Sequence, residues 1–400
     1  MTSFQEMTFS ELLSDAEVFV DGDWVESKDQ DPNGDVRLIQ LADIGDGFYI
    51  DKSSRFLNSE TAKRLKCTYL KECDILVARM PDPLGRACIF PKSDMPCVTV
   101  VDVCIIRPNQ NKVDNRWLMH TINSPVMRQR INEYVTGTTR QRISRGNFSK
   151  LKISVPPLAE QRRIASILDQ ADELRQKRLQ AIEKLDQLLQ ATFIDMFGDP
   201  EQNPKKWNKV ILGDICDAKD RVNYGVVQPG NDFEGGIPLI RVGDIDGGIL
   251  SFTSIKTIDP EIEKDYSRSR LKGNEILVSC VGSIGTIAKV PNKAIGFNIA
   301  RAITRVPLQD KRIINFVAEC LKTEAIQNYF KKNTRTVSQP TLNVSFVKET
   351  EIIFPNEEKI LDFCKIVDKV EFQKELLQKA LVMQESLFQS LQNQAFNGSL

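Results

Sequence analysis

The sequence is poor in the residues from which metal and hydrolytic sites are usually built. It has a single histidine, His120, among 400 residues, and its nine cysteines include no Cys-x-x-Cys pair. A zinc site of Cys and His ligands is therefore close to excluded, and Ser–His or other His-based acid–base schemes lose their base. An odd number of cysteines argues against a disulfide framework, so we expect buried, reduced thiols in a cytoplasmic protein.

Long apolar runs are missing as well. No stretch reaches 18 uninterrupted apolar residues, and the first residues, MTSFQEMTFSELLSD, lack the basic flank and apolar core of a signal peptide. Apolar residues make up 41% of the chain and charged residues 27%, which is typical of globular proteins. At 45.3 kDa the chain is too large for one ordinary core. We expect two or three compact domains and no membrane span.

Charge is balanced overall but not along the chain. The 54 basic residues equal the 54 acidic ones, so the total predicts no polyanionic partner. Residues 1–35 carry ten acids and one base, a net of −9, whereas residues 128–152 carry seven bases and one acid, a net of +6. Local charge decides where a phosphate backbone could lie, and that favours the basic segment.

Motifs recur along the chain at an offset of about 200 residues. Arg37–Gly47, RLIQLADIGDG, matches Pro238–Gly248, PLIRVGDIDGG, at an offset of 201, and Ile153–Pro156 matches Ile352–Pro355 at 199. Further matches between these follow in the same order, and the offset drifts by only two residues. The protein therefore consists of two diverged copies of one unit.

Both copies share an internal plan. Each begins with short β-rich runs separated by turns, continues through a short helix, a basic polar loop and a strand, and reaches a proline before a long helix. The plan predicts a mixed α+β protein. Its expected boundaries are 1–155 and 199–354 for two α/β domains, and 156–198 and 355–400 for two helices.

The two long helices are predicted from residues 159–196 and 358–395, where apolar residues recur every three or four positions without proline or glycine. At about 1.5 Å per residue each is about 55 Å long. Such a stripe needs a partner helix, and the other copy supplies one. We expect an antiparallel coiled coil about a pseudo-two-fold axis, with one α/β domain near each end and residues near 175 beside residues near 375. Its predicted core is Ile164, Ile167, Ala171, Leu174, Ile182, Leu185, Leu189, Ile360, Phe363, Val367, Val370, Leu377, Leu381, Leu387 and Leu391.

Duplicated domains at a fixed separation suit a target that repeats at a fixed separation, and duplex DNA is the commonest such target. Because the copies have diverged, they would read two different half-sites. The basic polar loop is the first candidate surface, since arginine suits guanine or phosphate and Asn and Gln suit adenine. Its candidate residues are Arg140, Gln141, Arg142, Arg145 and Asn147 in copy one, and Arg335, Thr336, Ser338, Gln339 and Asn343 in copy two.

Further candidates lie around the turn after the second strand. In copy one, Arg79 and Arg86 flank a tight Pro/Gly turn, at which a structural role and DNA contact are about equally favoured. In copy two, three residues lie in a polar loop for which copy one shows no clear equivalent, and two more cationic residues follow later. These five candidates are Asn223, Tyr224, Gln228, Lys289 and Arg301.

Signals for catalysis are weak. The chain has no Gly-rich strand-to-helix turn for a nucleotide or S-adenosylmethionine, no Asn-Pro-Pro-Tyr-type methylation motif and no distinct nuclease carboxylate set. We therefore predict no catalytic residue, no metal site and no cofactor in this chain.

Several stretches resemble the specificity subunit of type I restriction–modification systems. The most specific is Gly137–Arg163, GTTRQRISRGNFSKLKISVPPLAEQRR, which is similar to that family's junction between recognition domain and central conserved helix. Val20–Asp31 and Ile75–Pro91 look like one variety of its first recognition domain, and Gly273–Val290 looks like the common form of its second. Copy two departs from the pattern, because Thr334–Ser338 lacks the glycine that copy one has at 137.

The resemblance implies a non-catalytic DNA-binding subunit that serves host defence and DNA methylation. Residues 1–155 and 199–354 would be the two target-recognition domains of a bipartite, asymmetric site. The helix pair would set the spacer and bind two methyltransferase subunits, and motor-nuclease subunits would complete the enzyme. S-adenosylmethionine, ATP and Mg²⁺ would belong to those partners. Two alternatives remain open: a coiled-coil scaffold with two protein-binding heads, and an enzyme whose catalytic residues are not evident.

Overall fold

The computed structural model describes residues 4–137, 140–335 and 340–400. The chain divides into two compact units. Unit 1 comprises Met1–Leu179 and Lys379–Leu400, and unit 2 comprises Gln180–Gln378. Each unit therefore contains one α/β part and about half of each of the two long helices, α6 (Leu158–Phe197) and α11 (Glu357–Asn397).

Unit 1 is built from three small sheets. Strands β2, β8, β5 and β6 form an antiparallel sheet in that order, β4, β3 and β7 form a second in which β3 and β7 run parallel, and β1 pairs with β9. The elements before α6 are β1 (Gln5–Thr8), α1 (Phe9–Leu12), β2 (Val18–Asp21), β3 (Val36–Ile39), β4 (Phe56–Leu57), α2 (Ser59–Arg64), β5 (Ile75–Ala78), β6 (Ala87–Ile89), β7 (Cys97–Thr99), β8 (Val103–Arg107), α3 (Asn115–Asn123), α4 (Pro125–Glu133), α5 (Arg145–Phe148) and β9 (Lys152–Val155).

Unit 2 repeats this topology. Strands β11, β19, β16 and β17 form the antiparallel sheet, β15, β12 and β18 form the mixed one, and β10 pairs with β22. Its elements between the long helices are β10 (Asn208–Ile211), β11 (Asn223–Tyr224), β12 (Ile237–Ile240), β13 (Ile245–Asp246), β14 (Ile249–Leu250), β15 (Lys256–Ile258), α7 (Pro260–Lys264), β16 (Glu275–Ser279), β17 (Ile287–Lys289), β18 (Asn298–Ile299), β19 (Ile303–Pro307), α8 (Ile314–Lys322), α9 (Glu324–Lys332), β20 (Thr334–Arg335), β21 (Thr341–Leu342), α10 (Val344–Lys348) and β22 (Glu351–Phe354).

The long helices begin and end where the sequence predicts, within one or two residues. α6 starts directly after Pro156 and Pro157, and both helices stop at a glycine with a positive φ, 82° at Gly198 and 80° at Gly398. Glycine takes this left-handed conformation without steric cost, which makes it the usual residue just beyond a helix.

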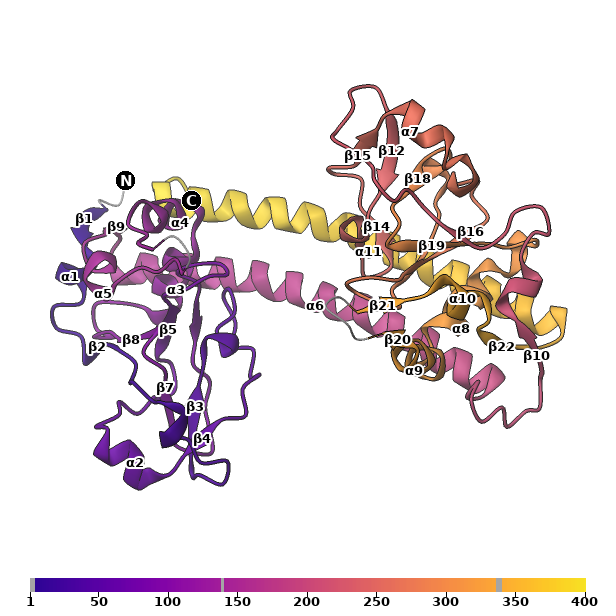
Figure 1. Ribbon diagram of the computed structural model, residues 1–400. Coiled ribbons are helices and arrows are strands. Elements are labelled where there is room, and N and C mark those ends of the chain that lie inside the picture. Colours follow the sequence, from indigo (N-terminus) through magenta and orange to yellow (C-terminus); the bar gives the residue numbers. More distant parts are fainter. Residues whose placement is uncertain (1–3, 138–139, 336–339) are drawn as a thin grey trace. The chain divides into compact units, whose positions relative to one another are not determined.

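The helix halves in each unit run in opposite directions. In unit 1, Arg163 near the start of α6 donates from Nη2 to the carbonyl oxygen of Leu400 at 2.8 Å, and the Arg175 guanidinium stacks on Phe388 of α11. Figure 1 shows the end of α11, in yellow, beside the start of α6, in magenta. In unit 2, Lys374 of α11 pairs with Asp186 of α6. The antiparallel arrangement is confirmed within each unit.

The expected alignment of the two helices is wrong by about a dozen residues. Arg175 lies against Phe388 instead of residues near 375, and Lys374 lies against Asp186. The contact between Arg163 and Leu400 at the helix ends sets this alignment. Because the helices are antiparallel, each step forward along α6 faces a step back along α11.

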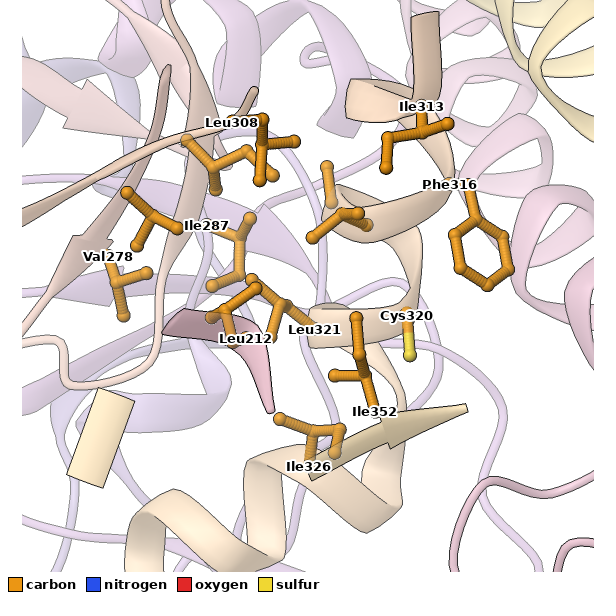
Figure 2. Packing of buried hydrophobic residues seen from close by; sticks show 14 of the residues in the cluster. Leu212, Val278, Ile287, Leu308, Ile313, Phe316, Cys320, Leu321, Ile326 and Ile352 are labelled. Carbon is orange, nitrogen blue, oxygen red and sulfur yellow. The ribbon is translucent and has the colours of Figure 1, made fainter. Parts of the chain in front are cut away.

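The apolar stripe of the helices packs mostly against the α/β parts. In unit 1, Ile164 and Leu168 of α6 and Ala395 of α11 share one buried cluster with Trp117 of α3. In unit 2 the corresponding cluster combines the end of α6 and the start of α11 with α8 and the sheet, and Figure 2 shows the part around α8. Its helix members are Leu189, Phe193, Phe197, Ile360, Phe363, Val367 and Val370.

Two residues of the predicted helix core are exposed. Leu174 is 57% exposed and Leu387 is 56% exposed. Both leucines therefore lie outside the strip of each helix that neighbouring elements cover. The remaining predicted positions are buried or half-buried.

Candidate nucleic-acid interface

Four predicted residues of copy two come together at one pocket of unit 2. The pocket has a volume of about 760 Å³ and is lined by Tyr224, Arg301, Arg335 and Asn343 among others. The backbone assembles it from separate segments, because Leu342 N donates to the carbonyl oxygen of Cys280 at 2.9 Å and Arg301 N donates to that of Val226 at 2.8 Å.

The equivalent surface of unit 1 can be located by strand register. Asp21 pairs with Cys104 in β8 as Tyr224 pairs with Thr304 in β19. Ile143 N donates to the carbonyl oxygen of Arg79 at 3.1 Å, as Leu342 N does to that of Cys280. Five positions of unit 1 can therefore be paired with positions of unit 2. With the residue of unit 1 first, the pairs are Asp21 and Tyr224, Arg79 and Cys280, Asp102 and Ala302, Arg142 and Thr341, and Arg145 and Val344.

This surface of unit 1 is a cluster of acids and arginines. Asp21 lies between two arginines, with Oδ1 3.2 Å from Arg79 Nε and Oδ2 3.6 Å from Arg145 Nε. Asp102 Oδ1 lies 3.5 Å from Arg142 Nη2. Arg145 also donates from Nη1 to the carbonyl oxygen of Phe19 at 2.9 Å. Two predicted arginines, Arg142 and Arg145, are thus held by carboxylates.

Arg79 and Arg86 are buried and make their contacts inside unit 1, so their role in DNA contact stays a prediction. Arg79 donates from Nη2 to the carbonyl oxygen of Val101 at 2.6 Å. Arg86 donates from Nε to the carbonyl oxygen of Ile44 at 2.6 Å and from Nη2 to that of Leu41 at 2.8 Å, and burial lowers its pKa. Each guanidinium binds carbonyl groups within unit 1.

Lys289 of β17 has both of its partners inside unit 2. Its Nζ donates to Asn315 of α8 and to Glu371 of α11, so it ties the sheet of unit 2 to the long helix. Its role in DNA contact stays a prediction.

The other predicted residues lie in varied settings. Arg140 and Gln141 are exposed in the basic loop, and Asn147 is half-buried on α5. Asn223 donates from Nδ2 to the carbonyl oxygen of Arg268 at 3.0 Å, and Gln228 is exposed outside the pocket lining. The predictions at Thr336, Ser338 and Gln339 fall outside the described residues.

Sequence analysis missed the copy-one equivalent of the loop around Tyr224. It is the end of β2, where Gly22 corresponds to Gly225. A Cβ at Gly22 would lie 2.3 Å from the carbonyl oxygen of Val100, and one at Gly225 would lie 1.7 Å from that of Ile299. Both glycines let the chain cross close to the neighbouring strand. The offset here is 203, outside the range of 199 to 201 in which the other matches lie.

The crossing presents an apolar side chain in each unit. Two residues after the glycine stand Trp24, which is 69% exposed, and Val227, which is 37% exposed and lines the pocket of unit 2. Trp24 donates from Nε1 to Glu26 at 3.2 Å. Neither residue was predicted, because a single exposed apolar side chain in a loop has no periodic pattern.

A buried ion-pair network supports the pocket of unit 2 from behind. The fully buried Arg305 donates to Asp220 and Glu275, and Lys272 donates to Asp220 at 2.7 Å. Burial by itself would raise the pKa of Asp220, but the hydrogen bonds from Arg305 and Lys272 outweigh it and hold that pKa below its usual value. The network fixes the segment that leads into β11.

The single histidine belongs to a junction and not to a reaction site. His120 Nε2 lies 2.8 Å from Asp169 of α6, which also accepts from Arg116 at 2.7 Å. Burial would raise the pKa of Asp169, but these two hydrogen bonds lower it overall. Unit 2 has a similar link between Asn315 of α8 and Asp368 of α11, at 2.6 Å.

The described residues contain no group of three or more His, Cys, Asp and Glu side chains placed to hold a metal ion. Burial raises the pKa of Cys104 and of Cys320 to about 12, so both thiols remain protonated. Within residues 4–137, 140–335 and 340–400, no helix is long and apolar enough to cross a membrane.

A twice-repeated α/β unit with cationic loops, carried on a shared pair of long helices, defines a two-headed binding protein. The family model "Type I restriction modification DNA specificity domain" matches residues 10–184 and 204–381. The chain belongs to this family. It is the DNA specificity subunit of a type I restriction–modification system, the non-catalytic component, and the resemblance stated from sequence is confirmed.

Individual relatives agree. The chain is 29% identical to the EcoBI specificity subunit of Escherichia coli over 326 residues, which are 74% of this chain and 68% of that protein. It is 20% identical to the MjaVIII specificity subunit of Methanocaldococcus jannaschii over 413 residues, 94% and 93% of the two chains. An S subunit from M. genitalium matches with a TM-score of 0.54 at 16% identity, over 99% of this chain and 96% of that one. The predicted mixed α+β fold is confirmed.

Proposed function

We propose that residues 1–155 and 199–354 are two target-recognition domains that each read one half of a bipartite, asymmetric DNA site. This proposal is supported by the different side chains that the two units have at equivalent positions. Asp21 and Arg145 in unit 1 correspond to Tyr224 and Val344 in unit 2, within one repeated fold. Two units with the same fold but different surface side chains suit two half-sites of different sequence.

The contacts to DNA come from the cationic loops. In unit 1 the exposed Arg140 and Gln141 precede Arg142, and in unit 2 Arg301 and Arg335 stand at the pocket with Asn343. Guanidinium groups bind phosphates or guanine edges, and amides bind adenine edges. The acids beside Arg142 and Arg145 hold these side chains in place until DNA is bound.

The helices of residues 156–198 and 355–400 set the spacer between the half-sites and receive two methyltransferase subunits. A helix of 40 residues is about 60 Å long, enough to span one to two turns of duplex DNA. Each unit leaves large apolar side chains of these helices exposed, which favours a protein partner there. They are Leu174, Leu179, Val382, Met383 and Leu387 in unit 1, and Leu188, Ile194, Phe372 and Leu376 in unit 2.

The chemistry of the system is assigned to other subunits. We assign S-adenosylmethionine, ATP and Mg²⁺ to partner subunits, because the sequence has no Gly-rich nucleotide-binding turn. These groups belong to the methyltransferase subunits and to the motor-nuclease subunits that join them. The EcoBI relative is the specificity subunit of a restriction enzyme, which supports such partners. The complex acts on DNA in the cytoplasm.

The proposal is tested with the chain in complex with its methyltransferase subunits. Methylated positions are mapped by sequencing in a host that carries both, and affinity for a duplex bearing the mapped site is measured against salt. Arg140→Ala and Arg142→Ala are expected to weaken binding by about 1–3 kcal/mol per base-reading contact and to reduce the salt dependence where a phosphate contact is lost. Arg55→Ala, an exposed arginine elsewhere in unit 1, is the matched control.

Two outcomes count against the proposal. Unchanged affinity and unchanged methylation sites in both loop variants would remove the loop from the DNA surface. Absence of any salt-sensitive DNA binding by the complex would favour the scaffold with two protein-binding heads.

A further inference from the structure

The pocket of unit 2 has an apolar lining. Val226 is buried beneath it, and Val227 and Val281 stand at its sides. The remaining apolar members are Pro229, Ala300, Ala302, Leu342 and Val344, and Cys280 adds a buried thiol. Hydrogen-bonding side chains come only from Tyr224, Thr341, Asn343 and the two arginines among the described lining residues.

The charge at the pocket is of one sign. Arg301 and Arg335 line it and both are exposed, and among the described lining residues none is acidic. An apolar hollow ringed by guanidinium groups suits a polyanion that carries an apolar group. A cationic ligand would be repelled by the two arginines.

The apolar lining arises from particular differences between the repeats. At the five equivalent positions unit 1 has only charged residues, whereas unit 2 has Tyr224, Cys280, Ala302, Thr341 and Val344. Arg79 of unit 1 extends its guanidinium to the carbonyl oxygen of Val101, the neighbour of Asp102. Its counterpart Cys280 has a short side chain, and this leaves the hollow open.

Among DNA bases only thymine offers an apolar group in the major groove. Its C5-methyl group is contacted by small apolar side chains, while the edges of adenine, guanine and cytosine present nitrogen and oxygen atoms there. Valine and alanine walls would leave those polar atoms without hydrogen-bond partners, which costs free energy. The valine and alanine part of the lining therefore favours a methyl group, and the hydrogen-bonding side chains are left for the DNA backbone or other base edges.

We propose that the pocket of unit 2 receives the C5-methyl group of a thymine in the half-site which that unit reads, while Arg301 and Arg335 hold the flanking backbone or base edges. This rests on the proposed reading of DNA by residues 199–354. The walls are preorganised, because Gly225 holds Val226 and Val227 against β18 and Asn343 Oδ1 accepts from Ser345 N at 3.1 Å at the start of α10.

Uracil in place of thymine removes only the methyl group, so it is the probe. Duplexes carrying the mapped site are made with each thymine of both half-sites replaced singly, and their affinities for the complex are measured. One replacement in the half-site read by unit 2 is expected to weaken binding about fourfold, the transfer free energy of one buried methyl group expressed as an affinity ratio. The double variant V227T/V281T is expected to bring the thymine-to-uracil ratio at that position close to one.

The matched control is Val126→Thr, the same substitution at an exposed valine of α4 in unit 1. It should leave the thymine-to-uracil ratio unchanged. A complex that prefers the mapped site over a scrambled duplex, but shows no uracil effect that V227T/V281T removes, overturns the inference and leaves the proposed function standing. A half-site without thymine overturns it as well. No preference for the mapped site overturns the proposed function itself.

Discussion

Arginine side chains have two roles in this chain, and whether the side chain is buried or exposed distinguishes the two roles. Arg86 and Arg305 are buried, and each binds groups of its own unit, either carbonyl oxygens or the carboxylates of Asp220 and Glu275. Arg140 on the basic loop and Arg335 at the end of β20 are exposed. A buried guanidinium needs fixed partners because its desolvation is costly, whereas an exposed one is available to a phosphate or a base.

Asp220 gives a test of the buried network. Asp220→Asn removes the charge opposite the fully buried Arg305, and we expect unit 2 to lose about 3 kcal/mol of unfolding free energy at pH 7. The folded-state pKa of Asp220 is lowered, so its contribution is present above the unfolded value of about 3.9 and is lost as pH falls through the folded value. The difference between wild type and variant should be constant from pH 7 to about 5 and shrink below about 4.

Urea unfolding followed by Trp207, the tryptophan of unit 2, measures this difference. Asp310→Asn is the control, because Asp310 pairs with Arg312 at the surface and should cost less than about 1 kcal/mol. Equal stability of the two variants at pH 7 would show that the Arg305 network does not stabilise the unit.

Individual residue roles were predicted from sequence only where local composition decides them. The exposed position of Arg140 and Gln141 follows from a loop of Gly, Ser, Thr and Arg. Burial of Arg79 and Arg86 did not follow, because it depends on carbonyl groups that lie far away in sequence, at Val101 and Leu41. The acid run of residues 1–35 likewise gives ion pairs with distant bases, such as Asp21 with Arg145.

At the scale of elements, one glycine in each unit allows the chain at the end of an edge strand to pass close to the backbone at a strand of the other sheet. The crossing places Val226 in a parallel bridge with Ala300 and Asp23 in one with Val100. This contact brings Val227 to the pocket of unit 2. The shape of the candidate interface thus depends on a backbone approach that only glycine permits.

Gly225→Ala tests this approach. Its Cβ would lie 1.7 Å from the carbonyl oxygen of Ile299, so β11 or β18 must shift. We expect a loss of about 1–3 kcal/mol of stability and weaker binding to the mapped DNA site. Thermal unfolding and a binding titration measure the two effects. Gly243→Ala is the control, since nothing lies within 4 Å of its Cβ, and an identical result for both variants would refute the role of the crossing.

The sequence predicted the helices better than it predicted what covers them. Periodicity and the bounding prolines and glycines set the limits of α6 and α11. The same periodicity assigned Leu174 and Leu387 to a helix–helix core, yet both are exposed, because the stripe is shared between the α/β parts and the other helix. Whether the α/β part or the other helix covers a given turn depends on tertiary packing, which the apolar pattern of a single helix does not specify.

At the scale of the whole molecule, duplication followed by divergence gives one chain two units of the same fold with different surfaces. The sheet order is repeated strand for strand, from β2-β8-β5-β6 to β11-β19-β16-β17, so the scaffold is conserved while the surface positions differ. Each long helix contributes its two halves to different units. The proposed spacer function therefore depends on the length of these helices.

Insertion of four residues in both helices, after Leu179 and after Gln378, tests this dependence. The insertions fall at the division between the units and lengthen each helix by about 6 Å, which corresponds to about two base pairs. Methylation mapping should then find both half-site sequences unchanged and the spacer lengthened.

A seven-residue insertion adds about 10 Å and rotates the units by only about 20°, so it tests the same idea if the first variant is inactive. Insertion in α6 alone is the control and should abolish methylation, because the antiparallel halves no longer match in length. Methylation at the original spacing in both paired variants would mean that something other than helix length measures the site.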